Sequence, residues 1–168
     1  SVDKLTIQNK GSGFGPPGST AIEKLNEHDV KIIEKVQGVD LVIPRLIRIV
    51  KTEYNEAIAY TYTGDLPDTK EKADIAYSAS NAEIDKGRLL REDDVGKVLI
   101  GADIAAATTF DKELEVGKKI KINGKDFEIV GILKKSSTFT VNTAVLMMND
   151  DLEKILNIKD EYDLIAVQ

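Results

Sequence analysis

Acidic side chains are the most frequent groups in this sequence that could do chemistry. The candidates are Asp93-Asp94, Asp111, Asp126 and Asp150-Asp151. Paired carboxylates can act as acid and base in a hydrolase, and grouped ones can bind Ca²⁺. A calcium loop places its ligands at alternating positions, as in D-x-D-x-D-G, and that spacing does not occur here. We therefore interpret Asp93-Asp94 as a solvated turn and Asp150-Asp151 as acids that favour the start of a helix.

The other candidates for chemistry are a histidine, a glycine run and three tyrosines. His28 is the only histidine, and its acidic neighbours predict a surface position rather than a place in a Ser-His-Asp triad. The Gly-x-Gly-x-Gly run at residues 11–15 lacks the spacing of a dinucleotide-binding loop and precedes two prolines, which favours a linker. Tyr54, Tyr60 and Tyr62 fall at strand positions, where half-buried aromatics are common. The sequence predicts no catalytic, cofactor-binding or metal-binding residue.

Composition excludes several classes of partner. The 29 acidic and 23 basic residues give a net charge of -6, the wrong sign for binding nucleic acid or anionic lipid headgroups. Without cysteine the chain has no disulfide, thiol nucleophile or thiolate metal site. Its 168 residues, 42% of them hydrophobic, are enough for one globular domain or two small lobes. No apolar run approaches the ~20 residues that span a bilayer, and none resembles a signal peptide.

The first third of the chain predicts a strand, a helix and further strands. Residues 5–7 alternate like a short strand. A helix then begins at Asn26, a favourable N-cap with Asp29 completing a capping box, and ends at Gly38. The strands expected after it are 39–43, a stretch through Ile47 and Ile49, and 57–62, with a turn at residues 54–56.

The last part of the chain repeats the order strand, helix, strand. Residues 144–148 predict a buried strand, Asn149 is expected to cap the helix that follows, and residues 163–167 form another strand. The turn-forming stretch 64–72 indicates a boundary between lobes. We therefore expect an α+β fold, in which both chain ends build a split βαβ, ferredoxin-like lobe around a β-rich insert, with the first and last strands antiparallel neighbours in the strand order 4-1-3-2.

A hairpin over residues 118–129 is the clearest local prediction. Its Asn123-Gly124 turn tolerates the two positive φ angles of a type I′ turn, so the register is fixed. Ile120 should then face Phe127, and Lys121 should face Asp126. One side of the hairpin is therefore expected on a core and the other in water.

Several segments together resemble one protein family. They are Gly87-Arg88-Leu89-Leu90, Asp94 to Gly101, Val116 to Gly124, Phe127 to Leu133, and the helix and strand that run to Pro44. In this order the set is similar to the periplasmic core domain of MacB/FtsX-type ABC transporter permeases. The resemblance implies a Porter-type lobe, at residues 1–63 and 136–168, and an inserted Sabre-type lobe at residues 64–135.

The resemblance also implies a function. Such a domain lies outside the cytoplasmic membrane, between the first two transmembrane helices of a permease that forms a homodimer and binds a cytoplasmic ABC ATPase. We expect a non-catalytic domain that couples ATP hydrolysis to export, extraction or activation of a partner, with an extracytoplasmic adaptor or substrate protein as a further partner, and with no cofactor. The alternative is an extracytoplasmic ligand-binding or sensing module with a pocket between its lobes.

Overall fold

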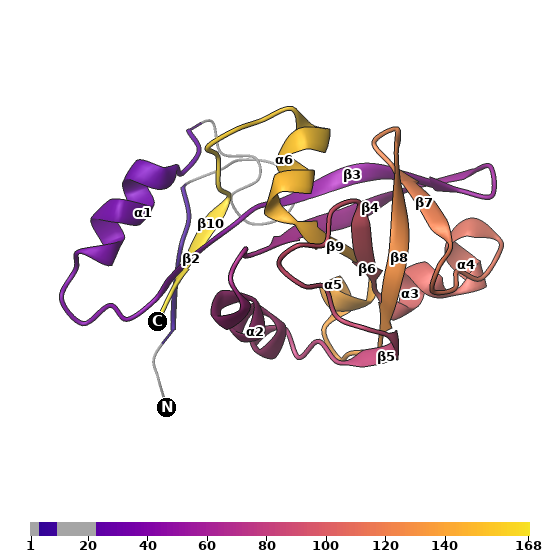
Figure 1. Ribbon diagram of the computed structural model, residues 1–168, viewed down its shortest axis with the longest axis horizontal. Helices are drawn as coiled ribbons and strands as arrows, with labels where there is room; N and C mark the ends of the chain where they lie inside the picture. The colour runs from indigo at the N-terminus through magenta and orange to yellow at the C-terminus, as the bar shows by residue number, and fades with distance from the viewer. Residues whose placement is uncertain (1–3, 10–22) are drawn as a thin grey trace.

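The computed structural model describes residues 4–9 and 23–168, which form two β-sheets with six helices around them. The smaller sheet and helix α1 lie at one end of the molecule, and the larger sheet occupies the rest (Figure 1). The elements in chain order are β1 (Leu5–Ile7), α1 (Glu27–Glu34), β2 (Val42–Arg45), β3 (Ile47–Tyr54), β4 (Ala57–Leu66), α2 (Lys70–Ala79), β5 (Ile84–Gly87), β6 (Lys97–Ile100), α3 (Ala102–Ala105), α4 (Ala107–Phe110), β7 (Lys119–Ile122), β8 (Lys125–Leu133), α5 (Phe139–Asn142), β9 (Ala144–Met148), α6 (Asn149–Leu156) and β10 (Leu164–Val167).

The small sheet joins elements from both ends of the chain. Its strand order is β1-β10-β2, with both pairings antiparallel and Leu5 opposite Val167. Helix α1 covers one face, and its capping box between Asn26 and Asp29 confirms the expected helix start. The core between helix and sheet contains Leu25, Val30, Val42, Ile165 and Val167. The predicted antiparallel contact between the first and last strands is therefore present.

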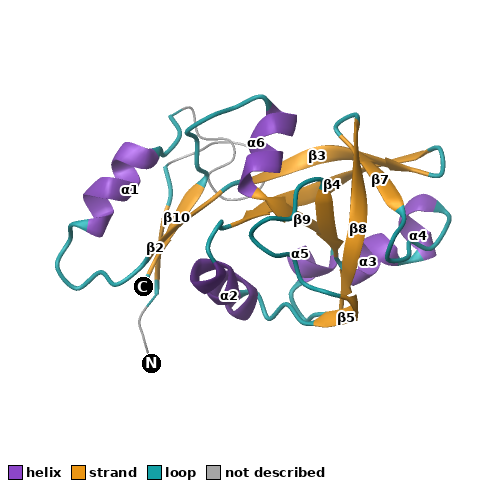
Figure 2. Ribbon diagram, in the orientation of Figure 1, coloured by secondary structure: helices purple, strands orange, loops and turns teal. Residues whose placement is uncertain are grey.

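The large sheet closes on itself. Its order is β5-β8-β6-β9-β4-β3-β7, and β7 pairs again with β8, so six strands form a barrel to which β5 is attached (Figure 2). Closure removes the exposed edges that an open sheet presents. Apolar side chains such as Val50, Ile129 and Met147 fill the interior, and α3, α4 and α6 supply Ile104, Phe110 and Leu152 to the same core.

Two hairpins of the barrel form as the sequence predicts. In β7 and β8, Ile120 lies opposite Phe127 and Lys121 opposite Asp126, and Asn123 and Gly124 both have positive φ. In β3 and β4 the turn residues Asn55 and Glu56 also have positive φ, the combination that matches the twist of two antiparallel strands. Both registers are therefore set locally.

The chain passes from one sheet to the other at positions that differ from the predicted lobe boundary. The boundary between residues 63 and 64 falls within β4, and β4 pairs with β9 in the barrel. The small sheet contains three strands of the described residues, whereas the ferredoxin-like order 4-1-3-2 needs four. The physical reason is that β2 continues into β3 with only Leu46 between them, and β3 pairs along its whole length with β4. That pairing takes β3 and β4 into the barrel.

Candidate functional site

The connection between the two sheets is the part of the structure with the most elaborate polar contacts. The chain passes from the small sheet to the barrel at Leu46, which is fully buried, and returns at Asp163, just before β10. Two buried aspartates, Asp65 and Asp163, hold the first of these passages. We call this set of contacts, centred on Arg45 to Arg48, the joint.

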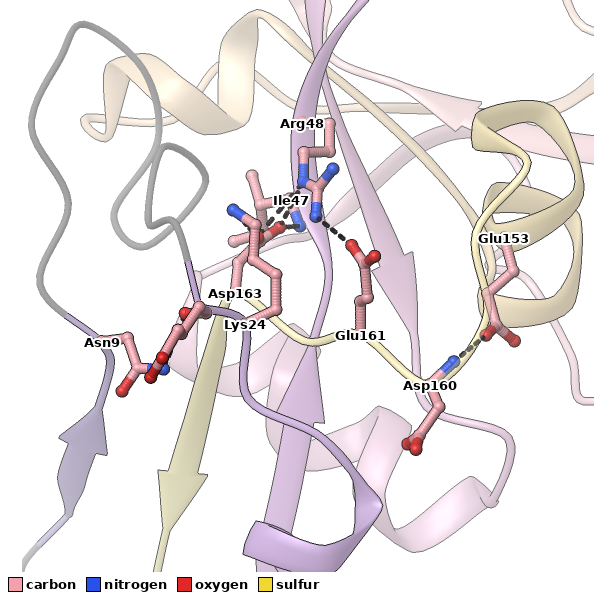
Figure 3. A network of polar contacts seen from close by, with 9 residues as sticks. Asn9, Lys24, Ile47, Arg48, Glu153, Asp160, Glu161 and Asp163 are labelled. Carbon is pink, nitrogen blue, oxygen red and sulfur yellow. Dashed lines mark hydrogen bonds and ion pairs between the residues drawn. The ribbon is translucent and has the colours of Figure 1, made fainter.

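Asp163 binds the joint from the side of β10. Its Oδ2 accepts hydrogen bonds from the backbone N–H of Ile47 (2.8 Å) and from Nε of Arg48 (3.0 Å). Lys24 Nζ lies 3.4 Å from Oδ1, and the Asp163 backbone N–H donates to the Arg45 carbonyl (2.9 Å). Figure 3 shows Lys24, Ile47 and Arg48 gathered around this carboxylate, with Glu161 bound to the outer side of Arg48. The carboxylate itself has no exposed surface.

Asp65 binds the same backbone from the side of the barrel. Its Oδ1 accepts from the Leu46 N–H (2.8 Å) and from Nε of Arg45 (3.2 Å), and Oδ2 accepts from Nδ2 of Asn149 (2.7 Å). The Asp65 backbone N–H donates back to the Leu46 carbonyl at 3.0 Å. Burial raises the pKa of Asp65, and the charge of Arg45 opposes that rise.

The two aspartates bind consecutive backbone amides, those of Leu46 and Ile47. Each of these bonds has a carboxylate as acceptor, and such bonds contribute roughly 1.5–3 kcal/mol when buried. Because both neighbouring amides are bound, and the carbonyls of Arg45 and Leu46 accept as well, the peptide that joins the sheets has little freedom to rotate. The arrangement suits a stiff mechanical connection. Asp163 is bound by two cations and an amide, which leaves it poorly placed to act as a base.

The acidic residues singled out in the sequence are dispersed. Asp94 is buried and accepts a two-pronged hydrogen bond from Arg88, at 2.7 and 2.9 Å, which lowers the pKa of Asp94 to about 2. Asp93 beside it is exposed, and Asp126 lies on the exposed side of the β7–β8 hairpin. The interpretation of Asp94 as part of a solvated turn was wrong, because the arginine draws it inward.

The helix-start residues also differ from expectation. The N-cap of α6 is Met148, so the prediction that Asn149 caps this helix is wrong, and the Asn149 side chain is turned toward Asp65 instead. Asp150 is exposed at its predicted place in the first turn of α6, whereas Asp151 is buried and accepts from the backbone N–H of Gly96 at 2.8 Å. Asp111 ends α4 in the left-handed conformation.

The remaining candidates lie apart from the joint. His28 is exposed in the first turn of α1, and the glycine run at residues 11–15 lies outside the described residues. Tyr54 packs edge-on against Phe110, with ring centroids 6.2 Å apart, while Tyr60 is exposed. Within the described ranges, no three side chains of His, Asp or Glu come together as metal ligands would. Each helix there is too short or too polar to cross a lipid bilayer.

The sequence did contain a signal for the joint. Arg45 and Arg48 interrupt an otherwise apolar run at residues 41–50. An arginine in a buried strand requires a buried acceptor, because an unpaired charge there is very unfavourable. Asp65 and Asp163, each beside an apolar strand segment, were the available partners. Only the fold could show which carboxylate meets which arginine.

The segment Gly87-Arg88 also has a structural role. Gly87 lies opposite Gly131 where β5 crosses β8, and its φ is +73°. A Cβ at Gly87 would overlap the Val130 carbonyl oxygen, and a Cβ at Gly131 would overlap the Arg88 carbonyl oxygen. The two glycines therefore let the backbones of β5 and β8 approach each other closely.

The fold matches solved extracytoplasmic domains of ABC transporters. The extracellular domain of the transporter YknZ from Gram-positive bacteria superimposes with a TM-score of 0.71 at 15% identity, covering 99% of this chain and 83% of that one. The periplasmic region of MacB from Actinobacillus actinomycetemcomitans gives a TM-score of 0.70 at 18% identity, covering 98% of this chain and 73% of that one. These likenesses define the class of fold.

The relatives found by sequence are ABC transporter proteins as well. An ABC transporter permease of Methanocaldococcus jannaschii is 32% identical over 92% of this chain. The macrolide export ATP-binding/permease protein MacB of Campylobacter fetus is 28% identical over 76% of it. The chain belongs to the MacB-like periplasmic core domain family, which it matches over residues 2–168, and it is thus an extracytoplasmic domain of an ABC transporter permease. It spans 37% and 20% of the lengths of the two relatives.

Proposed function

We propose that the chain is a non-catalytic domain that transmits motion from a membrane-embedded, ATP-driven part of the permease to a substrate or partner protein outside the membrane. The observation that carries the proposal is the pairing of β1 with β10. Leu5 lies opposite Val167, so the chain enters and leaves the domain side by side. Two neighbouring membrane helices continuing from these strands would move the small sheet directly.

The stiffness of the joint supports this role. A movement of β1 and β10 reaches the barrel through β2 and through the contact of Asp163 with Ile47 and Arg48. A flexible linker there would absorb the motion, whereas a connection with both consecutive amides bound passes it on. In this proposal the small sheet is the core of the Porter-type lobe and the barrel contains the Sabre-type insert.

The proposal includes partners that this chain does not itself contain. They are a second permease protomer, a cytoplasmic ABC ATPase subunit or domain, and an extracytoplasmic adaptor or substrate protein. The location is the extracytoplasmic face of the cytoplasmic membrane. Names of relatives support the ATPase, because one of them is an ATP-binding/permease protein and another an ABC transporter permease.

Spin-label distances in the full-length permease with its ATPase test the proposal. Labels can be placed at Lys35→Cys, just after α1, and at Lys125→Cys, on the exposed hairpin of the barrel, because these 168 residues contain no cysteine and any cysteine elsewhere in the permease and its ATPase can be replaced. We expect ATP turnover to leave the distance between these labels unchanged within one labelled protomer. The distance between Lys125→Cys labels on two protomers should change.

An ATPase variant that binds but does not hydrolyse ATP is the control. If the distance within one protomer changes during turnover, the joint bends and the proposal of stiff transmission fails. If the distance between protomers stays the same while ATP is hydrolysed, the domain does not move and transmission itself is excluded.

A further inference from the structure

A hollow of about 340 Å³ opens between α2 and the outer face of the barrel, beside the joint. Its walls come from five elements of the fold. Tyr62 and Leu146 belong to β4 and β9, Ala76 to α2, Val141 to α5 and Leu164 to β10. The volume is within the range of small-molecule sites, which runs from about 300 to 1,000 Å³.

Small residues create this hollow. Gly64, Ala76, Ala82 and Ala144 occupy positions on its walls where larger side chains would fill it. At Gly64 the limit is visible, because a Cβ would lie 3.1 Å from the Leu146 side chain and 3.8 Å from the guanidinium of Arg45. The space is therefore a consequence of residue choice on two strands and a helix.

Water has few hydrogen-bonding partners on these walls. Ser80 Oγ already donates to the Ala76 carbonyl (2.8 Å), and Arg45 is bound to Asp65. Tyr77 donates its hydroxyl to the Leu90 carbonyl at 3.4 Å, so the side-chain groups that remain to bind water are mainly the hydroxyls of Tyr62 and Thr140. A buried water needs two to four polar partners to be stable. Poorly held water is the kind that an apolar ligand displaces with a gain in affinity.

The walls also argue against a charged ligand. The nearest cation, Arg45, is neutralised by the buried Asp65, so it offers no unpaired charge to an anion. A second hollow of about 690 Å³ on the other side of Tyr77 differs in this respect, because Lys70, Asp74, Arg91 and Glu92 line it. The smaller hollow is thus the one whose chemistry selects a single class of ligand.

We propose that this hollow is a binding site for a small uncharged lipophilic molecule, lined by Tyr62, Leu66, Ala76, Ala144, Leu146 and Leu164. This site is independent of the transmission of motion. Because Leu164 belongs to the small sheet and Leu146 to the barrel, a bound molecule touches both bodies that the joint connects. Occupancy should therefore slow the local opening of β10 away from the barrel.

Fluorescence titration of the 168-residue chain with N-phenyl-1-naphthylamine tests the site. This uncharged dye brightens in apolar surroundings, and 8-anilino-1-naphthalenesulfonate is a matched probe that adds a charge. We expect saturable binding of the uncharged dye and affinity at least about tenfold weaker for the sulfonate. Ala144→Phe should weaken binding of the uncharged dye by at least about tenfold, because the ring fills the hollow.

Ser78→Phe is the matched control, because Ser78 is exposed on α2 and lies outside the hollow. Its affinity for the dye should equal that of the unmodified chain. If Ala144→Phe does not fold, Ala82→Leu narrows the hollow from another wall. Methyl NMR of the unmodified chain provides a test without substitution, since the dye should shift Leu146 and Leu164 but not Leu114 in the barrel core.

The proposal is overturned by any of four results. The first is the absence of saturable binding of the uncharged dye. The second is unchanged affinity in a folded Ala144→Phe chain. The third is a sulfonate that binds as tightly as the uncharged dye. The fourth is a set of methyl shifts spread over the barrel core, which would place the dye elsewhere.

Discussion

The barrel and the three-stranded sheet are stabilised in different ways. The barrel has a closed ring of strands and an interior packed from every side, with Phe110, Ile120 and Ile129 fully buried. The small sheet is open at β1 and β2, and Leu5 and Ile7 on its first strand are exposed. Among the residues that the structure describes, its core contains five buried hydrophobic residues, against sixteen in the barrel core. We therefore expect the small sheet to be the less stable region and to depend more strongly on the joint than the barrel does.

Truncation of a core side chain in each region should give the largest effect and the clearest contrast. We expect Phe110→Ala to lower the free energy of unfolding by about 3–5 kcal/mol, because it leaves a cavity in the barrel core. Ile165→Ala should cost about 2–5 kcal/mol for the same reason, but within the small sheet. Urea unfolding followed by circular dichroism measures both values.

Hydrogen exchange separates the two variants further. In Ile165→Ala, backbone amides of β1, β2 and β10 should exchange faster while those of β6 and β8 remain protected, because the small sheet opens locally. In Phe110→Ala, protection should fall in both regions. Equal loss throughout the chain in Ile165→Ala would mean that the two sheets unfold as one unit, and the contrast between them would be lost.

Removal of the charge at Asp163 tests the dependence of the small sheet on the joint. Asp163→Asn keeps the shape but leaves Arg48 without its buried carboxylate, and we expect a loss of about 2–4 kcal/mol. The effect is below that of a fully buried pair because the side chains of Arg48 and Lys24 are 18% and 16% exposed. Thermal or urea unfolding gives the value.

Glu161→Gln is the matched control for this prediction. It removes the charge of the Glu161 side chain, which is 35% exposed and binds the outer side of Arg48, and should cost less than about 1 kcal/mol. Equal effects of the two substitutions would show that the burial of Asp163 adds nothing.

The pairing of Asp94 with Arg88 predicts that the free energy of unfolding depends on pH through a contact in the barrel region. The folded pKa of Asp94 is about 2, below the ordinary value near 3.9 in an unfolded chain. Its stabilising contribution is therefore complete above about pH 4 and is lost as the pH falls toward 2. At pH 7, Asp94→Asn should cost about 1–2 kcal/mol, reduced by the 33% exposure of the Arg88 side chain.

Urea midpoints of Asp94→Asn and the unmodified chain, measured from pH 7 to pH 2.5, test that dependence. The gap between them should narrow below pH 4. A gap that stays constant would mean that packing, rather than ionisation, explains the loss.

Substitution of the helix N-caps should give the smallest difference in stability between the two regions. Asn26→Ala removes the capping bond from the Asp29 N–H to the Asn26 side chain and should cost about 1 kcal/mol, with faster exchange in the small-sheet region. Thr69→Ala on α2 removes one longer bond of 3.4 Å to the Lys72 N–H and should cost about half as much. If Thr69→Ala proves the more damaging, α2 supports the small sheet more strongly than its own helix does.

Local chemistry made some of these elements predictable. The Asn123-Gly124 turn fixed the register of β7 and β8, and the capping box at Asn26 fixed the start of α1, because each depends on residues a few positions apart. The family resemblance, which rests on several short segments in a given order, was also confirmed.

Long-range pairing explains what the sequence could not supply. Strand β4 was expected to end at Tyr62, yet it continues to Leu66 because β9 pairs with it in parallel from Tyr62 to Leu66. In the sequence, Gly64 and Asp65 are typical of a turn. In the structure, Asp65 instead accepts a hydrogen bond from the buried Leu46 amide. The partners of Arg45 and Arg48 are likewise distant in the chain, so propensity and spacing contain no information about them.

The pairing of β10 with β2 has a consequence for the order in which the molecule forms. Ile47 and Asp163, which meet at the joint, are 116 residues apart. During synthesis at roughly 5–20 residues per second, β2 waits on the order of 10 s for its partner strand to be made. All strands of the barrel are complete before β10 appears, so the barrel can close first. The small sheet then assembles last, beside a barrel that has already folded, because its strand β10 is the last to be synthesised.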